Sequence, residues 1–316
     1  MTSPTSSVAD RREAMVHRGF LYRDEAEVVD VCVPFLREGL EADDAVAVVA
    51  ATSNITALRD ALGPDAASVQ FEEALNWYQH PVRTIAAYDS FVRAEAPRRV
   101  RVIAEPVWQG RTPLEVLEWA RYESIVNAAF AYSGARAICC YDRRLLHPEI
   151  LDHARRNHPE IIDGRGPETS EAYTAPGPFS ATCDRRPLPA APRTAESLPI
   201  TTAGLDAVRT FVAERGSRWG VGHDALRDVV AAVAEVATTA IRHGGAPSRL
   251  SVWAQDGDLV SEISGPGHWY PDSLWGFSAP ADSEPAFGLW GVRMLCDVVQ
   301  MQADADGTCI RLRTRI

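Results

Sequence analysis

Residues 234–245 read AEVATTAIRHGG, and this stretch decides the fold of the second half of the chain. It predicts one helix that ends at Gly244 and Gly245, because glycine commonly follows the last helical residue. Glu235 and Thr239 are four residues apart, so their side chains share one face of that helix. The pattern is typical of the first part of a nucleotide site in which one residue has been exchanged.

The composition is that of an ordinary globular protein. The chain has 316 residues, enough for two domains that each bury a core. Apolar residues make up 46% of it and charged residues 24%. The net charge of -11 argues against a nucleic-acid partner and against adsorption to an anionic membrane, because both need clustered positive charge.

The basic residues are all arginine, and the sequence contains no lysine. Lysine grips phosphate in a P-loop, forms Schiff bases and contacts ATP in protein kinases. The sequence therefore excludes mechanisms that depend on any of these three lysines.

The cysteines and the N-terminal stretch carry no targeting or disulfide signal. The start, MTSPTSSVADRRE, lacks an apolar signal segment, and no apolar run reaches the roughly 18 residues of a membrane span. We therefore expect a cytoplasmic protein with a disordered stretch over residues 1–14. The six cysteines show neither a CxxC pair nor Cys/His ligand spacing, so we predict no zinc site, and Cys139 and Cys140 are expected in a buried strand.

Three zones follow one another along the chain. Residues 15–163 alternate short apolar runs such as AVAVVAAT and RAICCYD with helical patterns, which predicts a buried parallel sheet flanked by helices. Residues 164–197 are rich in Pro, Ser, Thr and Ala and are predicted to be a linker. Residues 198–316 predict two helices, a hairpin at Asp256 and Gly257, a helix over 288–299 and further strands, an α+β sandwich.

The third zone resembles the ATPase domain of the GHKL superfamily, in particular the anti-sigma-factor serine kinases of bacterial partner-switching systems. Three boxes carry the resemblance: AEVATTAIRHGG, SEISGPGHW and EPAFGLWGV. It implies an Mg-ATP site built from Glu-x-x-x-Asn, Asp-x-Gly-x-Gly and Gly-x-Gly boxes. In this sequence it implies Glu235 as the catalytic base and a set of nucleotide-binding residues: Glu235, Thr239, His243, Gly265, Gly267, Gly288 and Leu289.

Three positions depart from the family pattern. Thr239 replaces the Asn that holds Mg²⁺, and its hydroxyl reaches less far from the helix. Gly265, or Ser264 if the turn is shifted, replaces the Asp that accepts the adenine amino group, and Ala286 replaces a glycine near the phosphates. Losing a hydrogen bond to a charged acceptor and a metal ligand together costs about 3–6 kcal/mol, which moves a micromolar site into the millimolar range. We therefore predict a degenerate ATP site with Thr239 as a weak Mg²⁺ ligand.

Residues 15–160 resemble the MEDS domain, a sensory module often found before such ATPase domains. The matching segments are HRGFLYRDEAE, VPFLREGLEADDAVAVV, AEPVWQGR, WARYESIVNAAF and CCYDRRLLHPEILDHARRNHP. The family is related to the RecA/KaiC-type ATPase fold, so the resemblance implies a parallel sheet. LYRDEAEVVDV stands where that fold has its phosphate loop, and it offers neither glycines nor lysine. We expect the fold to be kept without a P-loop.

A small ligand is expected at the carboxyl ends of the strands of this first zone. The predicted sensory pocket takes its residues from the strand ends and a polar rim: His17, Tyr22, Glu105, Trp108, Arg111, Arg121, Glu123, Tyr141 and Asp142. A Trp and a Tyr beside charged groups suit a small amphipathic or aromatic ligand. Alternatively, Glu105 and Arg121 form a structural ion pair and Trp108 covers the core. His147, His153 and His158 are interpreted as exposed histidines of one helix.

Three functions remain open from the sequence. The first is a sensory domain that gates an anti-sigma-type module, which binds a sigma factor or an anti-anti-sigma factor of the STAS fold. The second is an active serine kinase of the same fold with Glu235 as base and Thr239 as metal ligand. The third is a nucleotide-independent small-molecule receptor whose C-terminal domain forms a homodimer through GLWGVRMLCDVV. Trp269, Trp275 and Trp290 are interpreted as packing or lid residues, or as an exposed docking surface.

Overall fold

The computed structural model describes residues 13–164, 166–201, 204–244, 248–267, 274–277, 288–304 and 307–316. The chain divides into two compact units. Unit 1 holds the described residues up to Gln79, together with Thr84–Gln109 and Val126–Thr174. Unit 2 holds His80–Arg83, Gly110–Ile125 and the described residues from Ala175 to Ile316. No described helix combines the length and the apolar character needed to cross a membrane.

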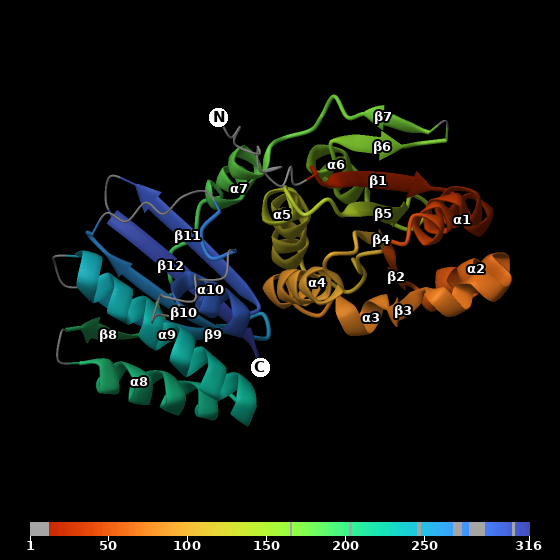
Figure 1. Ribbon diagram of the computed structural model, residues 1–316. Helices are drawn as coiled ribbons and strands as arrows, with labels where there is room; N and C mark the ends of the chain where they lie inside the picture. The colour runs from red at the N-terminus through yellow and green to blue at the C-terminus, as the bar shows by residue number, and fades with distance from the viewer. Residues whose placement is uncertain are drawn as a thin grey trace, which may run out of the picture. The chain divides into compact units, whose positions relative to one another are not determined.

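Unit 1 is built on a seven-stranded sheet in the order β3-β2-β4-β5-β1-β6-β7 (Figure 1). All neighbouring strands are parallel except β6 and β7. The central strands are buried along almost their whole length and are apolar or aromatic apart from Arg101, Arg136 and Asp142, as expected of strands covered on both faces. The strands are β1 (Val16–Tyr22), β2 (Ala45–Ala50), β3 (Gln70–Glu73), β4 (Val100–Ala104), β5 (Arg136–Asp142), β6 (Glu160–Ile162) and β7 (Pro167–Thr169).

The helices of unit 1 pack against both faces of this sheet. Phe20 and Tyr22 of β1 point to the face where α1 and α2 form the main core. His17 and Gly19 alternate with them and point to the opposite face, where the end of α6 lies. The helices are α1 (Glu25–Glu41), α2 (Thr52–Leu62), the 3-10 helix η1 (Gly63–Ser68), α3 (Ala74–Trp77) and α6 (Pro148–Asn157). Two further helices, α4 (Pro81–Glu95) and α5 (Pro113–Ala129), contribute residues to both units.

A tight turn joins β1 to α1 where a phosphate loop was ruled out from the sequence. Asp24 caps α1 by accepting a hydrogen bond from the backbone N–H of Glu27 at 3.0 Å. The Glu27 carboxylate in turn accepts hydrogen bonds from the backbone and the guanidinium of Arg23. These carboxylates occupy the N-terminus of α1 and would repel phosphate there. The prediction of a parallel sheet without a P-loop is therefore consistent with this turn.

Unit 2 contains a five-stranded antiparallel sheet in the order β11-β12-β10-β9-β8. Its strands are β8 (Glu196–Ile200), β9 (Ser248–Gln255), β10 (Asp258–Gly265), β11 (Val298–Asp304) and β12 (Gly307–Arg315). The helices α8 (Leu205–Arg218), α9 (His223–Gly244) and α10 (Gly288–Leu295) share one apolar core with the sheet, and Figure 1 shows α8 and α9 along it. The predicted fold classes of both halves are confirmed.

Two local predictions differ from the structure. The helix predicted over 288–299 ends at Leu295, because Val298 and Val299 pair with Arg313 and Leu312 of β12 instead. β-branched residues next to a strand gain more from the sheet than from one further helical turn. The segment 164–197, predicted as a linker, contains β7 and a helix, α7 (Pro176–Asp184). Phe179 and Cys183 of α7 pack on α5 within unit 2.

Candidate functional site

Unit 1 has a cleft of about 390 Å³ at the carboxyl ends of its parallel strands. The ends of β1, β2, β4 and β5 all border it, through Tyr22, Ala50, Glu105 and Asp142. Strand ends meet at one edge of a parallel sheet, and the helices that follow them diverge there and leave room for a ligand. The cleft lies at the position that the sequence predicts for the sensory pocket.

Glu105 is the polar centre of this cleft. Its Oε1 accepts a 2.7 Å hydrogen bond from the Tyr22 hydroxyl. Its Oε2 accepts hydrogen bonds from the Ala51 backbone N–H at 2.8 Å and from Asn54 Nδ2 at 2.9 Å. Burial, together with the negative charge of Glu105, raises the pKa of Tyr22 above its usual range. The phenol therefore stays a hydrogen-bond donor at physiological pH.

The rim of the cleft combines charge with exposed apolar side chains. Asp142 accepts hydrogen bonds from the Arg144 guanidinium at 2.9 and 2.7 Å, and this contact lowers the pKa of Asp142. Leu75 and Leu145 line the same cleft, although their side chains are 71% and 67% exposed. They are two of the four large apolar side chains that are exposed among the described residues. An apolar rim over a polar base suits an amphipathic ligand.

Four of the nine predicted pocket residues line the cleft: Tyr22, Glu105, Trp108 and Asp142. His17 and Tyr141 lie on the other face of the sheet, because side chains alternate along β1 and β5. Burial lowers the pKa of His17 well below its usual value. Sequence analysis missed Asn54, Leu75 and Arg144. Asn54 follows the end of β2, so the same strand-end rule would have included it.

Arg111, Arg121 and Glu123 belong to unit 2. The guanidinium of Arg111 stacks over the Trp119 ring at 4.1 Å, and burial lowers the pKa of Arg111 to about 10. Arg121 is buried and pairs with Asp184 at 2.8 Å and with Glu118 at 3.4 Å. Within their own units, Glu105 accepts hydrogen bonds from Tyr22 and Asn54, and the ion-pair partners of Arg121 are Asp184 and Glu118.

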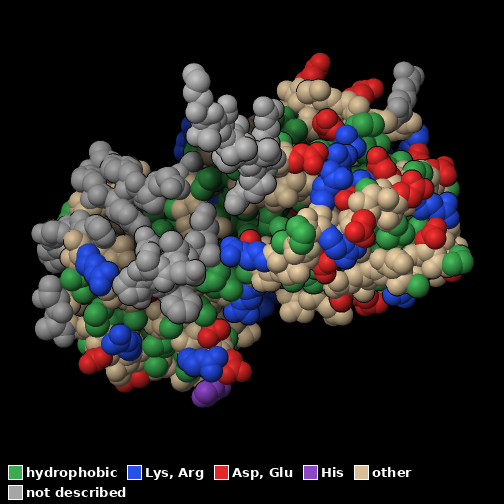
Figure 2. All heavy atoms as spheres, in the orientation of Figure 1, with side chains coloured by type: hydrophobic (Ala, Val, Ile, Leu, Met, Phe, Trp, Pro, Cys, Tyr) green, Lys and Arg blue, Asp and Glu red, His purple; other side chains and the backbone are tan. Residues whose placement is uncertain are grey.

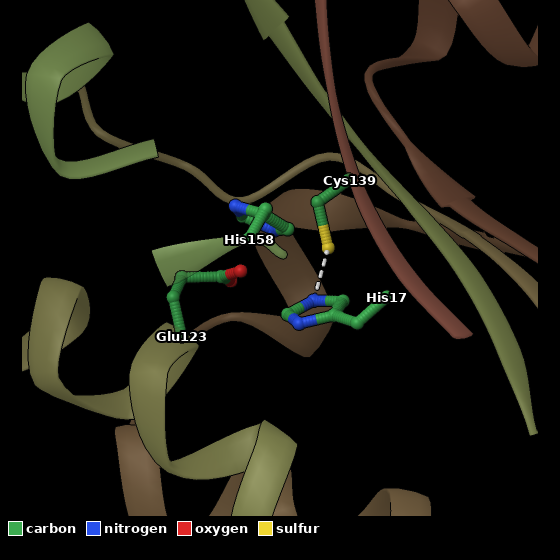
Figure 3. A group of neighbouring side chains, drawn as sticks. All are labelled: His17, Glu123, Cys139 and His158. Atoms are coloured by element: carbon green, nitrogen blue, oxygen red, sulfur yellow. Dashed lines mark hydrogen bonds between the residues drawn. The ribbon is translucent and has the colours of Figure 1, made fainter. Parts of the chain in front are cut away.

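The histidines of α6 differ from the interpretation made from the sequence. His147 is exposed and caps the helix by accepting a hydrogen bond from the Glu149 backbone N–H. His153 and His158 are buried, with 6% and 0% of their surface exposed. The helix is strongly amphipathic, and residues 153, 154, 157 and 158 form its inward face. His158 thereby comes close to His17 and Cys139 (Figure 3).

The first nucleotide box of unit 2 lies near the C-terminal end of α9. Glu235 and Thr239 are half-buried side chains of α9. Neighbouring residues of the same helix, such as Val233 and Val236, belong to the core. Glu235 has no hydrogen-bond or ion-pair partner among the residues that the structure describes. The side chain of His243, also predicted for this site, lies outside the described part of the chain.

Gly265, at the adenine position, ends β10 in very close contact with its neighbours. A Cβ atom at this position would clash with Ser248 Oγ and lie 3.1 Å from Ser248 Cβ. The backbone of Gly265 and Pro266 also packs against Gly307, where a Cβ would clash as well. A carboxylate side chain at position 265 would thus require Ser248 to move.

The remaining nucleotide positions lie at two element ends. Gly267 follows β10, and its carbonyl accepts a 2.8 Å hydrogen bond from the Thr308 hydroxyl. Gly288, with a φ of 51°, begins α10, and Leu289 packs against the core. Ala286 and Trp269 lie outside the described residues. Trp275 is buried, and its indole N–H donates a 3.1 Å hydrogen bond to Asp184, so it packs rather than docks.

Acidic and basic side chains both occur on the face shown in Figure 2. Acidic and basic side chains are interspersed over unit 1 in that view.

Comparisons with known proteins bear on both units. Residues 16–159 match the family model of the MEDS domain, described as "MEthanogen/methylotroph, DcmR Sensory domain". Residues 198–314 match the model of the histidine kinase-like ATPase domain. A search of curated proteins finds no significant match.

Among solved structures, the chain is similar to the RsbU and RsbW domains of Rv1364c from Mycobacterium tuberculosis. The two share 21% sequence identity with a TM-score of 0.31. The similarity covers 40% of this chain and 33% of the other, so the chain spans about a third of the length of that relative. On the two family matches, the chain carries a MEDS sensory domain followed by a histidine kinase-like ATPase domain, in the order predicted from its sequence.

Proposed function

We propose that this protein is a signalling regulator of the partner-switching type. In this proposal the cleft of unit 1 binds a small ligand, and unit 2 binds a sigma factor, an anti-anti-sigma factor of the STAS fold, or both. Unit 2 acts by binding, with a degenerate ATP site. The match to a sensory domain followed by a histidine kinase-like ATPase domain supports this order of input and output.

The lining of the cleft supports a neutral or cationic amphipathic ligand. Four carboxylates border it, those of Glu25, Glu73, Glu105 and Asp142, against the single guanidinium of Arg144. An anionic ligand would be repelled, whereas a hydroxyl or amine could donate to Glu105. The exposed Leu75 and Leu145 offer contacts to the apolar part of such a ligand.

Helix α5 supports coupling between the ligand and the partner. Its first part, up to Ile125, belongs to unit 2, and its last part, from Val126, belongs to unit 1. In this proposal α5 is the element through which ligand binding in unit 1 alters unit 2.

One observation carries the proposal of a degenerate nucleotide site. Gly265 lacks a carboxylate, and Ser248 fills the space that the Cβ of an aspartate would need. A changed residue at one box can be tolerated, but here Ser248 of the neighbouring strand also occupies the space beside position 265. Thr239, half-buried on α9, is the second missing ligand group.

Calorimetric titration with Mg-ATP tests this proposal. We expect no micromolar binding to the full chain. A triple variant, Thr239→Asn with Gly265→Asp and Ser248→Gly, should gain affinity, because it restores both ligands and removes the clash. Ser248→Gly alone is the matched control and should gain nothing. Micromolar binding to the wild type would instead favour an active kinase, with Glu235 as its base.

Capture experiments test the partner. The full chain, immobilised, should retain a sigma factor or a STAS-domain protein from the source cell, and retention should change when the cleft ligand is supplied. If neither class of protein is retained and the chain is a homodimer, the nucleotide-independent receptor is the better reading.

A further inference from the structure

Three side chains that can ligate a metal ion meet inside unit 1, away from the ligand cleft. His17 comes from β1, Cys139 from β5 and His158 from the C-cap of α6. Each is buried, with exposed fractions of 3%, 4% and 0%. One ligand atom from each lies within 4.8 Å of the others, and Figure 3 shows the three side chains turned toward one another.

The distances between these side chains are close to those of a metal site. His17 Nε2 lies 3.2 Å from Cys139 Sγ, and the rings of His17 and His158 are 4.2 Å apart. Ligand atoms around a tetrahedral zinc ion with bonds of about 2.1 and 2.3 Å are roughly 3.5 Å apart. The pair formed by His17 and Cys139 already has nearly that separation.

Hydrogen bonds fix the tautomer of His17. Asn127 donates through Nδ2 to the backbone carbonyl of Asn157 at 2.8 Å, so its Oδ1 faces the imidazole. That oxygen lies 3.0 Å from His17 Nδ1 and can only accept, so Nδ1 carries the proton. The lone pair of the neutral ring is therefore on Nε2, the atom beside Cys139 Sγ.

His158 is held in the same way. Its Nδ1 lies 2.7 Å from the Ala154 carbonyl, which also can only accept. Metal-binding histidines typically donate one ring N–H to a carbonyl and bind the ion through the other nitrogen. Both histidines have this arrangement.

Gly19 provides the space for the third ligand. A Cβ atom at Gly19 would lie 3.1 Å from two atoms of the His158 ring and 2.9 Å from Ile161 Cδ1. The absence of a side chain on β1 thus lets the His158 ring lie on the strand between His17 and Cys139. A purely apolar core would have no need of this gap.

We propose that His17, Cys139 and His158 bind one thiophilic transition-metal ion, zinc or copper(I), and thereby fasten β1, β5 and α6 together. Thiolate and imidazole are the ligands that these ions prefer. Three protein ligands leave a further position for water or another donor. Glu123, which Figure 3 also draws, belongs to unit 2, and the proposal does not depend on it. Binding converts the Cys139 thiol to a thiolate and releases one proton to solvent.

Metal analysis of the purified full chain tests the proposal. The protein is produced in medium supplemented with zinc or with copper, because a buried site fills most readily during folding. After removal of loosely held ions, we expect about one ion per chain from at least one of the two media. Cobalt(II) in place of zinc should give a thiolate-to-cobalt charge-transfer band.

Matched variants separate this site from chance binding. Cys139→Ala should lose the ion, whereas Cys140→Ala should keep it, because Cys140 is on the other face of β5, 4.0 Å from Cys32 Sγ. Asn127→Ala should weaken binding by about 10–100-fold, the usual effect of losing a partner that orients a ligand. A wild-type chain free of metal from both media would overturn the proposal, as would full metal content in Cys139→Ala. Should Cys139→Ala not fold, the cobalt band of the wild type decides by itself.

Discussion

The Tyr22 hydroxyl donates a 2.7 Å hydrogen bond to Glu105 Oε1, which joins the ends of two strands separated by β5. Because Glu105 also binds the start of α2 through Ala51 and Asn54, one carboxylate holds three strand ends in a fixed position. The same carboxylate lies in the cleft. A ligand that donates a hydrogen bond to this carboxylate therefore changes contacts that reach across the sheet.

Removing the Tyr22 hydroxyl should lower the free energy of unfolding of unit 1. Tyr22→Phe removes a hydrogen bond to a charged acceptor, which contributes about 1.5–3 kcal/mol. We expect a loss of that size in the free energy of unfolding, measured with urea. Tyr132→Phe is the control, because that side chain is 72% exposed. Equal losses in the two variants would contradict the role given to Glu105.

Removing one member of the Glu118–Arg293 ion pair should lower the free energy of unfolding much more than replacing both members by apolar residues. Its atoms are 2.8 Å apart, and the two side chains are only 7% and 3% exposed. Burial lowers the pKa of Arg293 to about 10. Arg293→Met leaves the buried Glu118 carboxylate with only its longer, 3.4 Å contact to Arg121 and should cost up to about 3–5 kcal/mol of unfolding free energy.

The double variant Glu118→Leu with Arg293→Met should recover most of that loss, since no buried charge is then left without its partner. The exposed pair of Asp89 and Arg93 is the control, and Arg93→Ala should change stability by less than about 0.5 kcal/mol. A double variant no more stable than Arg293→Met would show that the pair is not the cause.

Gly265→Ala should destabilise unit 2 through a steric clash with Ser248. Over-packing of this kind costs about 1–3 kcal/mol. Ser248→Gly in the same chain should restore part of the loss, because it removes the clashing atoms. Gly222→Ala is the control, since a Cβ there meets nothing within 4 Å and the φ is not in the left-handed region. Thermal unfolding of the three variants decides, and a lack of rescue would contradict the geometry on which the nucleotide proposal rests.

His80 should make the stability of unit 2 depend on mildly acidic pH. Its Nε2 lies 2.9 Å from the Cys296 carbonyl, and burial lowers the pKa of His80 in the folded state. Below a pH of about 6.5, His80 is protonated in the unfolded chain but stays neutral in the folded chain. The free energy of unfolding therefore decreases as the pH falls. The slope for one group is at most about 1.4 kcal/mol per pH unit.

Urea unfolding at pH 8 to 5 measures this slope. His80→Gln should flatten it, because glutamine does not titrate and can still donate to the carbonyl. His223→Gln should leave the slope unchanged, since the His223 side chain is 93% exposed. A slope that His80→Gln leaves intact would point to other groups.

The sequence by itself determined the central strands of the first zone, the hairpin and last strands of the third zone, and the order of the two folds. Residues 45–50 and 137–141 are apolar or aromatic at every position, a pattern typical of a strand covered on both faces. The helix of residues 234–245 likewise contains its own stop at Gly244. These signals are local, so no knowledge of distant contacts was needed to read them.

Only the tertiary structure decided which side chains share a site. His17 and Tyr22 lie on one strand, yet alternation sends them to opposite faces, so the predicted pocket divides into a cleft and a buried group of histidines and cysteine. His17 and Cys139 are 122 residues apart in sequence, and no spacing rule links them. Helix α10 ends early for a similar reason, because pairing with β12 outweighs the helical preference of the residues after Leu295. Local patterns fix elements, whereas sites depend on which elements the core brings together.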